Sequence, residues 1–319
     1  MHALQLIAPR TFQRTEVPDP FDTLPEEHVA VRLRTAAVCG SDMPYFKGEV
    51  ADPFPLEVGL SIHECIGEVS ASRSGRFRPG QRVLALPFHQ RGLFEYLALP
   101  AGRVFPIAED SPPHHVLAQP LATVLWACRK LPSLLGKRVV VLGQGPIGLY
   151  FDQLIASGGA RQVIGVDLVP ERLAAGARMG ATACIDGRST DVVEAVRELT
   201  DGEMADVVVE AVGHQPATVN LAIDVAAQGG DVLLFGVPTE KPYPFPMRAF
   251  FKKNLNLLTS VDPDLGRYFP LAIDMVQRGV VDVAPLATHS FSVSEIAAAF
   301  RLVEARTEGV LKPIITFDW

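Results

Sequence analysis

A strand, a glycine-rich turn, a helix and a second strand follow one another directly in the middle of this chain. The apolar run Val139–Leu142 leads into Gly143–Gly148 (Gly-Gln-Gly-Pro-Ile-Gly), an apolar stretch continues to Ala156, and the run Val163–Val166 ends at Asp167. A strand that returns to its own sheet through a helix lies parallel to the first, with a right-handed connection. The order therefore predicts an α/β fold with a doubly wound parallel sheet.

Such a glycine turn is where a parallel sheet binds the pyrophosphate of a dinucleotide. Gly143 permits the tight turn, Gly145 lets the backbone approach the pyrophosphate, and Gly148 lets the helix pack on the strand. The Asp167 carboxylate can accept the adenosine ribose hydroxyls and would repel a 2′-phosphate, so we expect NAD in preference to NADP. The expected cofactor-binding residues are Gly143, Gly145, Pro146, Ile147, Gly148, Asp167, Arg172, Val212 and Gly213.

A second interpretation of the same residues stays open. The glycines could be ordinary turn residues, and Asp167 could be the N-cap of a helix that opens at Pro170. Arg172 could reach the ribose, or it could be a solvated arginine on a helix surface. The complete order of strand, turn, helix, strand and acid favours the cofactor interpretation, because isolated matches lack that context.

The 319 residues exceed one typical domain, so we expect two. Residues 1–121 carry short β-rich segments between Pro and Gly clusters, which predicts a compact sheet or barrel-like domain. Residues 122–262 alternate strands with helices, and residues 263–319 are expected to return to the first domain. The expected elements outside the glycine region are strands at His28–Arg34, Ile66–Ala71, Arg82–Leu86, Phe94–Leu99, Val207–Val209, Asp231–Phe235, Leu255–Thr259 and Pro313–Phe317, with helices at Pro170–Met179, Tyr268–Arg278 and Ser294–Arg306.

Charge and cysteine content exclude several classes of protein. A net charge of −7 with no basic cluster argues against nucleic acid as a partner. The apolar runs are of strand length and no charged leader opens the chain, so we expect a cytoplasmic protein without membrane contact. The four cysteines suggest no disulfide framework. Cys65, Cys128 and Cys184 are expected to be small buried hydrophobes, although Cys65 directly follows Glu64.

Two short runs upstream of the glycine turn, Cys39-Gly-Ser-Asp42 and His63-Glu64, combine a thiol, an imidazole and a carboxyl group. These are the ligand types that Zn²⁺ prefers. Taken alone, His63 would be interpreted as a buried histidine with hydrogen-bonded ring nitrogens. The presence of Cys39 and Glu64 favours its interpretation as a metal ligand.

Together these residues resemble the zinc-dependent medium-chain dehydrogenases, in the branch of sorbitol, threonine and sugar dehydrogenases. The resemblance implies a β-rich GroES-like catalytic domain, Cys39 and His63 as zinc ligands, and Glu64 as a ligand or close neighbour of the metal. It further implies that Ser41 passes on the alcohol proton and that Asp42 orients a ligand imidazole. The blocks that carry it are Cys39–Asp42, Ile62–Glu64, Gly67–Val69, Gly80–Val83, Gln119–Ala122, Gly143–Gly148, Glu210–Gly213, Gly230, Gly236 and Thr288–Phe291.

The chain departs from the family pattern at several positions. The four-cysteine lobe of a second, structural zinc is missing, so we expect one zinc at most. Ile62 replaces a glycine and could tilt the ligand loop, while Gln119 takes the place of an anionic third ligand and would bind zinc more weakly. Pro44 replaces a proton-relaying histidine. Tyr45, Phe88 and His89 could line the substrate pocket or simply pack under a surface loop.

The resulting expectation is an NAD-dependent, zinc-assisted oxidoreductase that interconverts a secondary alcohol and a ketone on a small polar substrate. A polyol, sugar or cyclitol is favoured, and the resemblance implies a homodimer or homotetramer. Two alternatives stay open: a zinc-free reductase on the same fold, and an NAD-binding protein without turnover.

Overall fold

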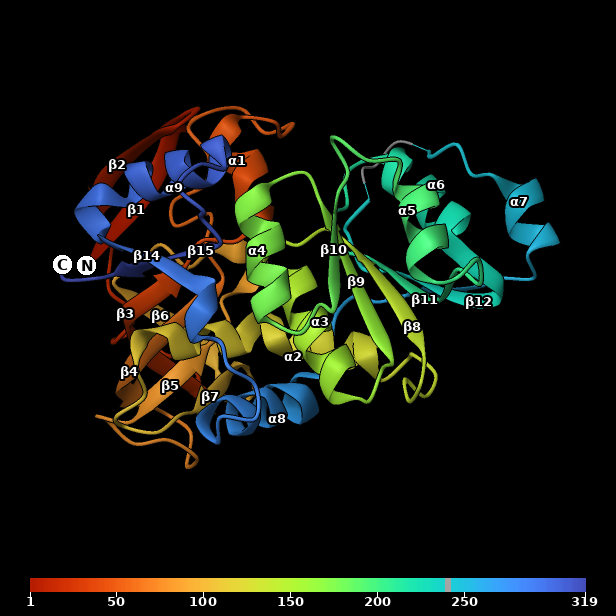
Figure 1. Cartoon of the computed structure of the whole chain (residues 1–319). Coiled ribbons are helices and arrows are strands. Elements are labelled where there is room, and N and C mark those ends of the chain that lie inside the picture. Colours follow the sequence, from red (N-terminus) through yellow and green to blue (C-terminus); the bar gives the residue numbers. More distant parts are fainter. Residues whose placement is uncertain (239–241) are drawn as a thin grey trace. The chain divides into compact units, whose positions relative to one another are not determined.

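The computed structural model describes residues 1–238 and 242–319 and divides them into two compact units. Unit 1 comprises Met1–Pro120 and Leu265–Trp319, and unit 2 comprises Leu121–Asp264. Most of the helices and strands of each unit are labelled in Figure 1. In the part of the chain that the structure describes, no helix is both long and apolar enough to span a bilayer.

Unit 1 is built on a seven-stranded, mainly antiparallel sheet in the order β14-β15-β3-β4-β5-β7, with β6 also paired to β3. A separate hairpin is formed by β1 and β2. The last strand, β15, pairs antiparallel with β3, so the C-terminal segment completes the sheet that the N-terminal residues begin. The strands are β1 (His2–Ala8), β2 (Thr11–Glu16), β3 (His28–Ala37), β4 (Glu64–Ser72), β5 (Arg82–Ala85), β6 (Tyr96–Pro100), β7 (Val104–Pro106), β14 (Ala287–Ser292) and β15 (Lys312–Thr316).

Aromatic side chains fill the core between the hairpin and the helices of unit 1. Phe46 and Phe300 are fully buried with ring centroids 5.0 Å apart, and Phe12 packs edge-on against Phe300 at 5.1 Å. Truncating either buried ring to alanine would cost about 3–5 kcal/mol. The α-helices here are α1 (Met43–Lys47), α8 (Leu265–Gln277) and α9 (Ile296–Ala305), with short 3-10 turns η1 (Gly40–Asp42), η2 (Phe88–Gln90), η3 (Ala101–Arg103), η4 (Pro113–Leu117), η5 (Ala284–Leu286) and η6 (Val293–Glu295).

Unit 2 contains a six-stranded parallel sheet in the order β10-β9-β8-β11-β12-β13. Strands β8 to β12 of this sheet are labelled in Figure 1. The order reverses between β8 and β11, which is where such sheets bind ligands beyond the carboxyl ends of their strands. Residues Val139–Val141 are fully buried because helices cover both faces. The elements are β8 (Arg138–Leu142), β9 (Gln162–Asp167), β10 (Ala183–Asp186), β11 (Ala205–Glu210), β12 (Ala226–Leu234), β13 (Asn256–Thr259), α3 (Pro146–Ser157), α4 (Pro170–Arg178), α5 (Val192–Leu199), α6 (Pro216–Val225), α7 (Met247–Lys252) and most of α2 (Ala118–Cys128), whose first residues belong to unit 1.

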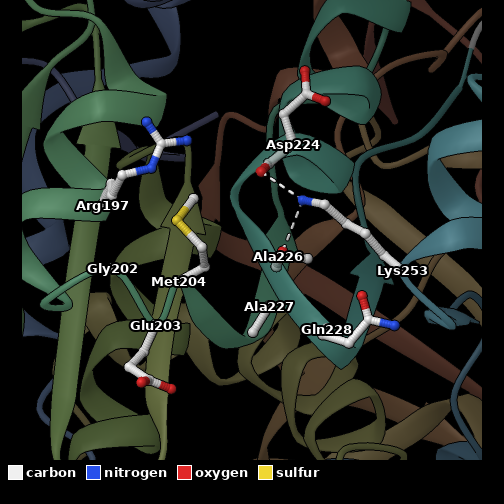
Figure 2. A pocket seen from close by; sticks show the side chains of 9 residues that line it. All are labelled: Arg197, Gly202, Glu203, Met204, Asp224, Ala226, Ala227, Gln228 and Lys253. Atoms are coloured by element: carbon white, nitrogen blue, oxygen red, sulfur yellow. Dashed lines mark hydrogen bonds between the residues drawn. The ribbon is translucent and has the colours of Figure 1, made fainter.

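An open pocket of about 420 Å³ lies at the amino ends of β11 and β12, between the loop before β11 and the end of α6 (Figure 2). The Lys253 ammonium group donates to the backbone oxygens of Ile223, Asp224 and Ala226 at 2.8–2.9 Å. Its three hydrogens thus satisfy carbonyl groups at the end of α6 that have no partner within the helix. Lys253 therefore has a structural role here.

All the expected strands and helices are present, with ends that differ by at most three residues, except that β12 begins five residues before the expected Asp231. The expectation for Cys184 was wrong, because its side chain is exposed. Cys184 lies on β10, the outermost strand of the sheet in the described residues. Cys65 is buried as expected, and Cys128 is partly buried.

Candidate metal and cofactor sites

Three chemically distinct side chains come together where β3 and β4 of unit 1 meet. One ligand atom each from Cys39, His63 and Glu64 lies within 4.8 Å of the others. Cys39 follows the end of β3, and Glu64 opens β4 opposite Ala37. Of the His, Cys, Asp and Glu side chains in residues 1–238 and 242–319, this is the group of three or more that is suitably placed for a metal ion.

Asp42 connects the two loops that carry this cluster. Its fully buried carboxylate accepts the Cys39 backbone N–H at 2.7 Å and the Ile62 N–H at 2.8 Å. The distance from Asp42 Oδ1 to His63 Nδ1 is 3.8 Å, which is an ion-pair contact but too long for a hydrogen bond. In this structure Asp42 therefore fixes the backbone of both loops.

The residues directly before His63 have an uncommon backbone conformation. Ser61 and Ile62 have φ angles of +86° and +71°, a region in which non-glycine residues cost of order 1–3 kcal/mol each. Ile62 is nevertheless fully buried, and its N–H is held by Asp42. Hence the side chain that replaces a glycine here is accommodated by packing and a buried acceptor.

The electrostatic surroundings favour the ligand form of Cys39. Burial raises the pKa of its thiol, but the Lys312 ammonium and the His63 imidazole lower it, with a net result of about 5. Burial lowers the pKa of His63, and contacts with Asp42 and Cys39 raise it well above its usual range. A thiolate is the form of cysteine that binds metals.

Lys312 is a site residue that the sequence analysis missed. It is 3% exposed, and its ammonium group donates a hydrogen bond to Oε1 of the fully buried Glu64. Burial raises the pKa of the Glu64 carboxyl against the lowering effect of Lys312. The sequence contains one indication of this role, a single lysine within the apolar run Val310–Ile315. Lysine is almost never fully buried without a partner, so a buried acidic partner could have been expected.

The donor set fits a zinc ion. Sulfur, imidazole nitrogen and carboxylate oxygen are its usual ligands, and small side-chain movements would bring atoms 4.8 Å apart around one tetrahedral centre. Oε2 of Glu64 and Nδ1 of His63 are buried without a hydrogen-bond partner. Unpaired buried acceptors are costly in proteins, and a cation in contact with Glu64 Oε2 would compensate its charge.

The other residues expected at this site lie in varied surroundings. Gln119 is buried at the start of α2, directly after η4, which packs against β3 and β4. Ser41 is partly exposed within η1, two residues from Cys39, and Tyr45 packs against the core of unit 1. Phe88 and His89 lie in η2 with exposed side chains, and the Arg103 guanidinium stacks 4.2 Å from the centre of the Phe88 ring.

The glycine turn of unit 2 joins β8 to α3 and is tightly packed. A Cβ atom at Gly148 would lie 1.8 Å from the Gly143 carbonyl oxygen, so only glycine fits there. At Gly145 the nearest atom, 3.7 Å from such a Cβ, is Nη1 of Arg172, which places that guanidinium beside the turn. Gly143 itself has a φ of +92°, which favours glycine.

Two carboxylates hold the loops on either side of this turn. Asp167 accepts the N–H of Gln144 at 2.7 Å through Oδ2, and the N–H groups of Leu168 and Val169 through Oδ1. The N-cap of α4 is Val169, so Asp167 does not cap that helix. Glu210, buried at the end of β11, accepts the Val212 and Gly213 N–H groups at 3.0 and 2.9 Å.

Comparison with known proteins identifies the family. Residues 146–278 match the zinc-binding dehydrogenase family, and residues 25–109 match the alcohol dehydrogenase GroES-like domain. The chain belongs to the zinc-type medium-chain dehydrogenases. The predicted fold class, a GroES-like domain with a parallel-sheet Rossmann-like domain, is thereby confirmed.

Similar proteins in this dehydrogenase family include the sorbitol dehydrogenase of Bacillus subtilis, which is 24% identical and covers 86% of both chains. A short chain alcohol dehydrogenase of Escherichia coli CFT073, solved with NADH, has a TM-score of 0.85 at 23% identity and covers 99% of each chain. A zinc-binding dehydrogenase of Sinorhizobium meliloti, solved with NADP, has a TM-score of 0.85 at 24% identity and covers 99% of this chain and 98% of that one.

Proposed function

We propose that this dehydrogenase interconverts a secondary alcohol and a ketone on a small polar substrate, with one zinc ion and NAD. The observation that supports the proposal is the cluster of the partly buried Cys39 and His63 with the fully buried Glu64, whose Oε2 has no hydrogen-bond partner. When bound there, zinc would act as a Lewis acid that favours loss of the alcohol proton.

The residues around the cluster have separable roles in this proposal. Cys39 as thiolate and His63 as neutral imidazole would hold the metal, with Gln119 as the third ligand. Glu64 would lie beside the metal or bind it when no substrate is present, and Lys312 would hold its other oxygen. The Ser41 hydroxyl, in the turn after Cys39, would accept the substrate proton and pass it on.

The cofactor proposal rests on the turn of unit 2 and on Asp167. A carboxylate has about four acceptor positions, and three backbone N–H groups use three of those of Asp167. The remaining position, on Oδ2, can accept a ribose hydroxyl, while the negative charge opposes a 2′-phosphate. We therefore favour NAD, although similar structures hold NADH in one case and NADP in another.

A polyol, sugar or cyclitol remains the favoured substrate class, supported by the similarity to a sorbitol dehydrogenase. We further propose a homodimer or homotetramer in which two copies pair through β13. This strand is an edge of the unit 2 sheet, and Leu257 on it and Val261 just beyond it are exposed. Exposed apolar edge strands pair readily with a second copy.

The proposal is tested by following NADH formation over a panel of polyols, sugars and simple secondary alcohols, before and after removal of metal with a chelator. Activity with at least one polyol, lost with the metal and restored by Zn²⁺ alone, supports it. Activity that survives complete metal removal would favour the zinc-free reductase. NAD binding without turnover on any alcohol or ketone would favour the non-catalytic protein.

A further inference from the structure

The side chain of Gln144, in the middle of the glycine turn, points into unit 2. It is fully buried, although its backbone lies between Gly143 and Gly145 at the proposed cofactor site. A Cβ atom on Gly165 of β9 would lie 2.6–2.9 Å from the Gln144 carboxamide, and one on Gly176 of α4 would lie 2.1 Å from its Oε1. The absence of side chains at these two glycines creates the space that the carboxamide occupies.

Asp152 of α3 faces the same space. It is fully buried, and neither of its oxygens has a hydrogen-bond donor. Its Oδ2 lies 3.5 Å from the Cβ position of Gly176, the point that is 2.1 Å from Gln144 Oε1. Oε1 of Gln144 is also buried without a partner, so two oxygen acceptors share one enclosed space.

Two acceptors without a donor are unfavourable, and a proton on one of them removes the conflict. Burial raises the pKa of the Asp152 carboxyl well above its usual range, and contact with Gln144 lowers it only in part. Among the described residues, no charged group of β8, β9 or α4 adds to this shift. On β10, the Cys184 thiol is the titratable group that the Asp152 charge reaches.

We propose that Asp152 is a protonated, neutral acid that donates a hydrogen bond to Gln144 Oε1 and so positions the glycine turn for the dinucleotide. The hydrogen bond from Asp152 would influence Asp167 through Gln144 alone, because the Gln144 backbone N–H donates to Asp167 Oδ2. Asp152 is thus a positioning residue for the carboxylate proposed to bind the ribose. The inference rests on the proposed role of this turn in NAD binding.

The binding test compares the NADH dissociation constants of the full-length protein, Asp152→Asn and Asp152→Ala at pH 7 and pH 9.5, by NADH fluorescence. Asparagine keeps a donor without a charge, so Asp152→Asn should bind NADH like the unmodified protein at pH 7 and lose no affinity at pH 9.5. Asp152→Ala should bind about tenfold more weakly at both, as expected for an unsatisfied buried acceptor. The unmodified protein should bind NADH more weakly at pH 9.5 than at pH 7. Cys184→Ser should show the same loss of NADH affinity.

A second measurement does not depend on NADH. The infrared difference spectrum between unmodified protein and Asp152→Asn at pH 7 should contain the carbonyl band of a protonated carboxylic acid. Absence of that band, or equal loss of NADH affinity in Asp152→Asn and Asp152→Ala, would overturn the inference. Failure of the unmodified protein to bind NADH at all would instead overturn the proposed function, while the infrared band would still decide the protonation state.

Discussion

The most direct structural prediction concerns the buried ion pair between Lys312 and Glu64. The change Lys312→Met keeps an unbranched side chain, one heavy atom shorter, but leaves the Glu64 carboxyl, which is fully buried, without its cation. Removing one partner of a buried ion pair costs about 3–5 kcal/mol. For a domain of 150–250 residues, each kcal/mol lowers Tm by about 2–4 °C, so we expect a loss of about 6–20 °C.

The assay is thermal unfolding of metal-free protein, followed by circular dichroism, for Lys312→Met, for Glu64→Met and for the double variant. Replacing both charges with apolar groups of similar volume is often neutral or stabilising. The double variant should therefore unfold at a higher temperature than Lys312→Met, close to the unmodified protein. Arg278→Met is the matched control, because it breaks an exposed pair with Asp274 and should leave Tm unchanged.

Two results would refute this reasoning. If Lys312→Met left Tm within the range of the Arg278→Met control, the pair would not carry the energy of a desolvated contact. If the double variant were as unstable as Lys312→Met, the loss would come from missing packing of the lysine side chain rather than from an unpaired carboxylate.

Three further predictions follow from the two sites. In Asp167→Ser, the preference for NAD over NADP in kcat/KM should fall by at least about tenfold through loss of a charged acceptor; an unchanged ratio would exclude Asp167 from the ribose site. Gln119→Glu should bind zinc more tightly in chelator competition, because it adds an anionic ligand; unchanged affinity would mean that Gln119 does not touch the metal. Asp152→Asn should be more stable than the unmodified protein at pH 8 and lose that advantage near pH 4, measured by urea unfolding at both values; a constant difference would contradict a raised Asp152 pKa.

The sign of the last prediction follows from linkage. Burial raises the pKa of Asp152 in the folded state, whereas in the unfolded chain it titrates near the ordinary value of about 3.9. The stability associated with the protonated group is fully present below the unfolded pKa. It is lost as the pH rises toward the folded pKa, because the unfolded chain then releases a proton that the folded protein retains. Asparagine does not titrate, so Asp152→Asn does not show this loss of stability as the pH rises.

Local sequence patterns were sufficient for the elements that depend on neighbouring residues. The apolar run before Gly143 predicted β8, and the turn followed by Pro146 predicted α3, because strand and helix periodicities are local properties. The approach of Cys39, His63 and Glu64 was expected from the kinds of side chain, and the structure places their ligand atoms within 4.8 Å. That Cys39 and Glu64 come together depends on pairing between β3 and β4.

Long-range contacts account for what the sequence did not predict. Lys312 reaches Glu64 only because β15 pairs with β3. Gln144 and Asp152 resembled a turn residue and a polar helix position, and nothing local indicates that both side chains share the space left by Gly165 and Gly176. Their burial is a property of how α3, α4 and β9 pack together.

We propose that Cys39, His63 and Glu64 form the one zinc site of this dehydrogenase. Elemental analysis of purified protein tests it most directly, with Cys39→Ala and, as a control, Cys184→Ala on the exposed edge strand. We expect about one zinc per chain in the unmodified protein and in Cys184→Ala, and essentially none in Cys39→Ala together with loss of activity. About two zinc ions per chain, or zinc retained in Cys39→Ala, would contradict it.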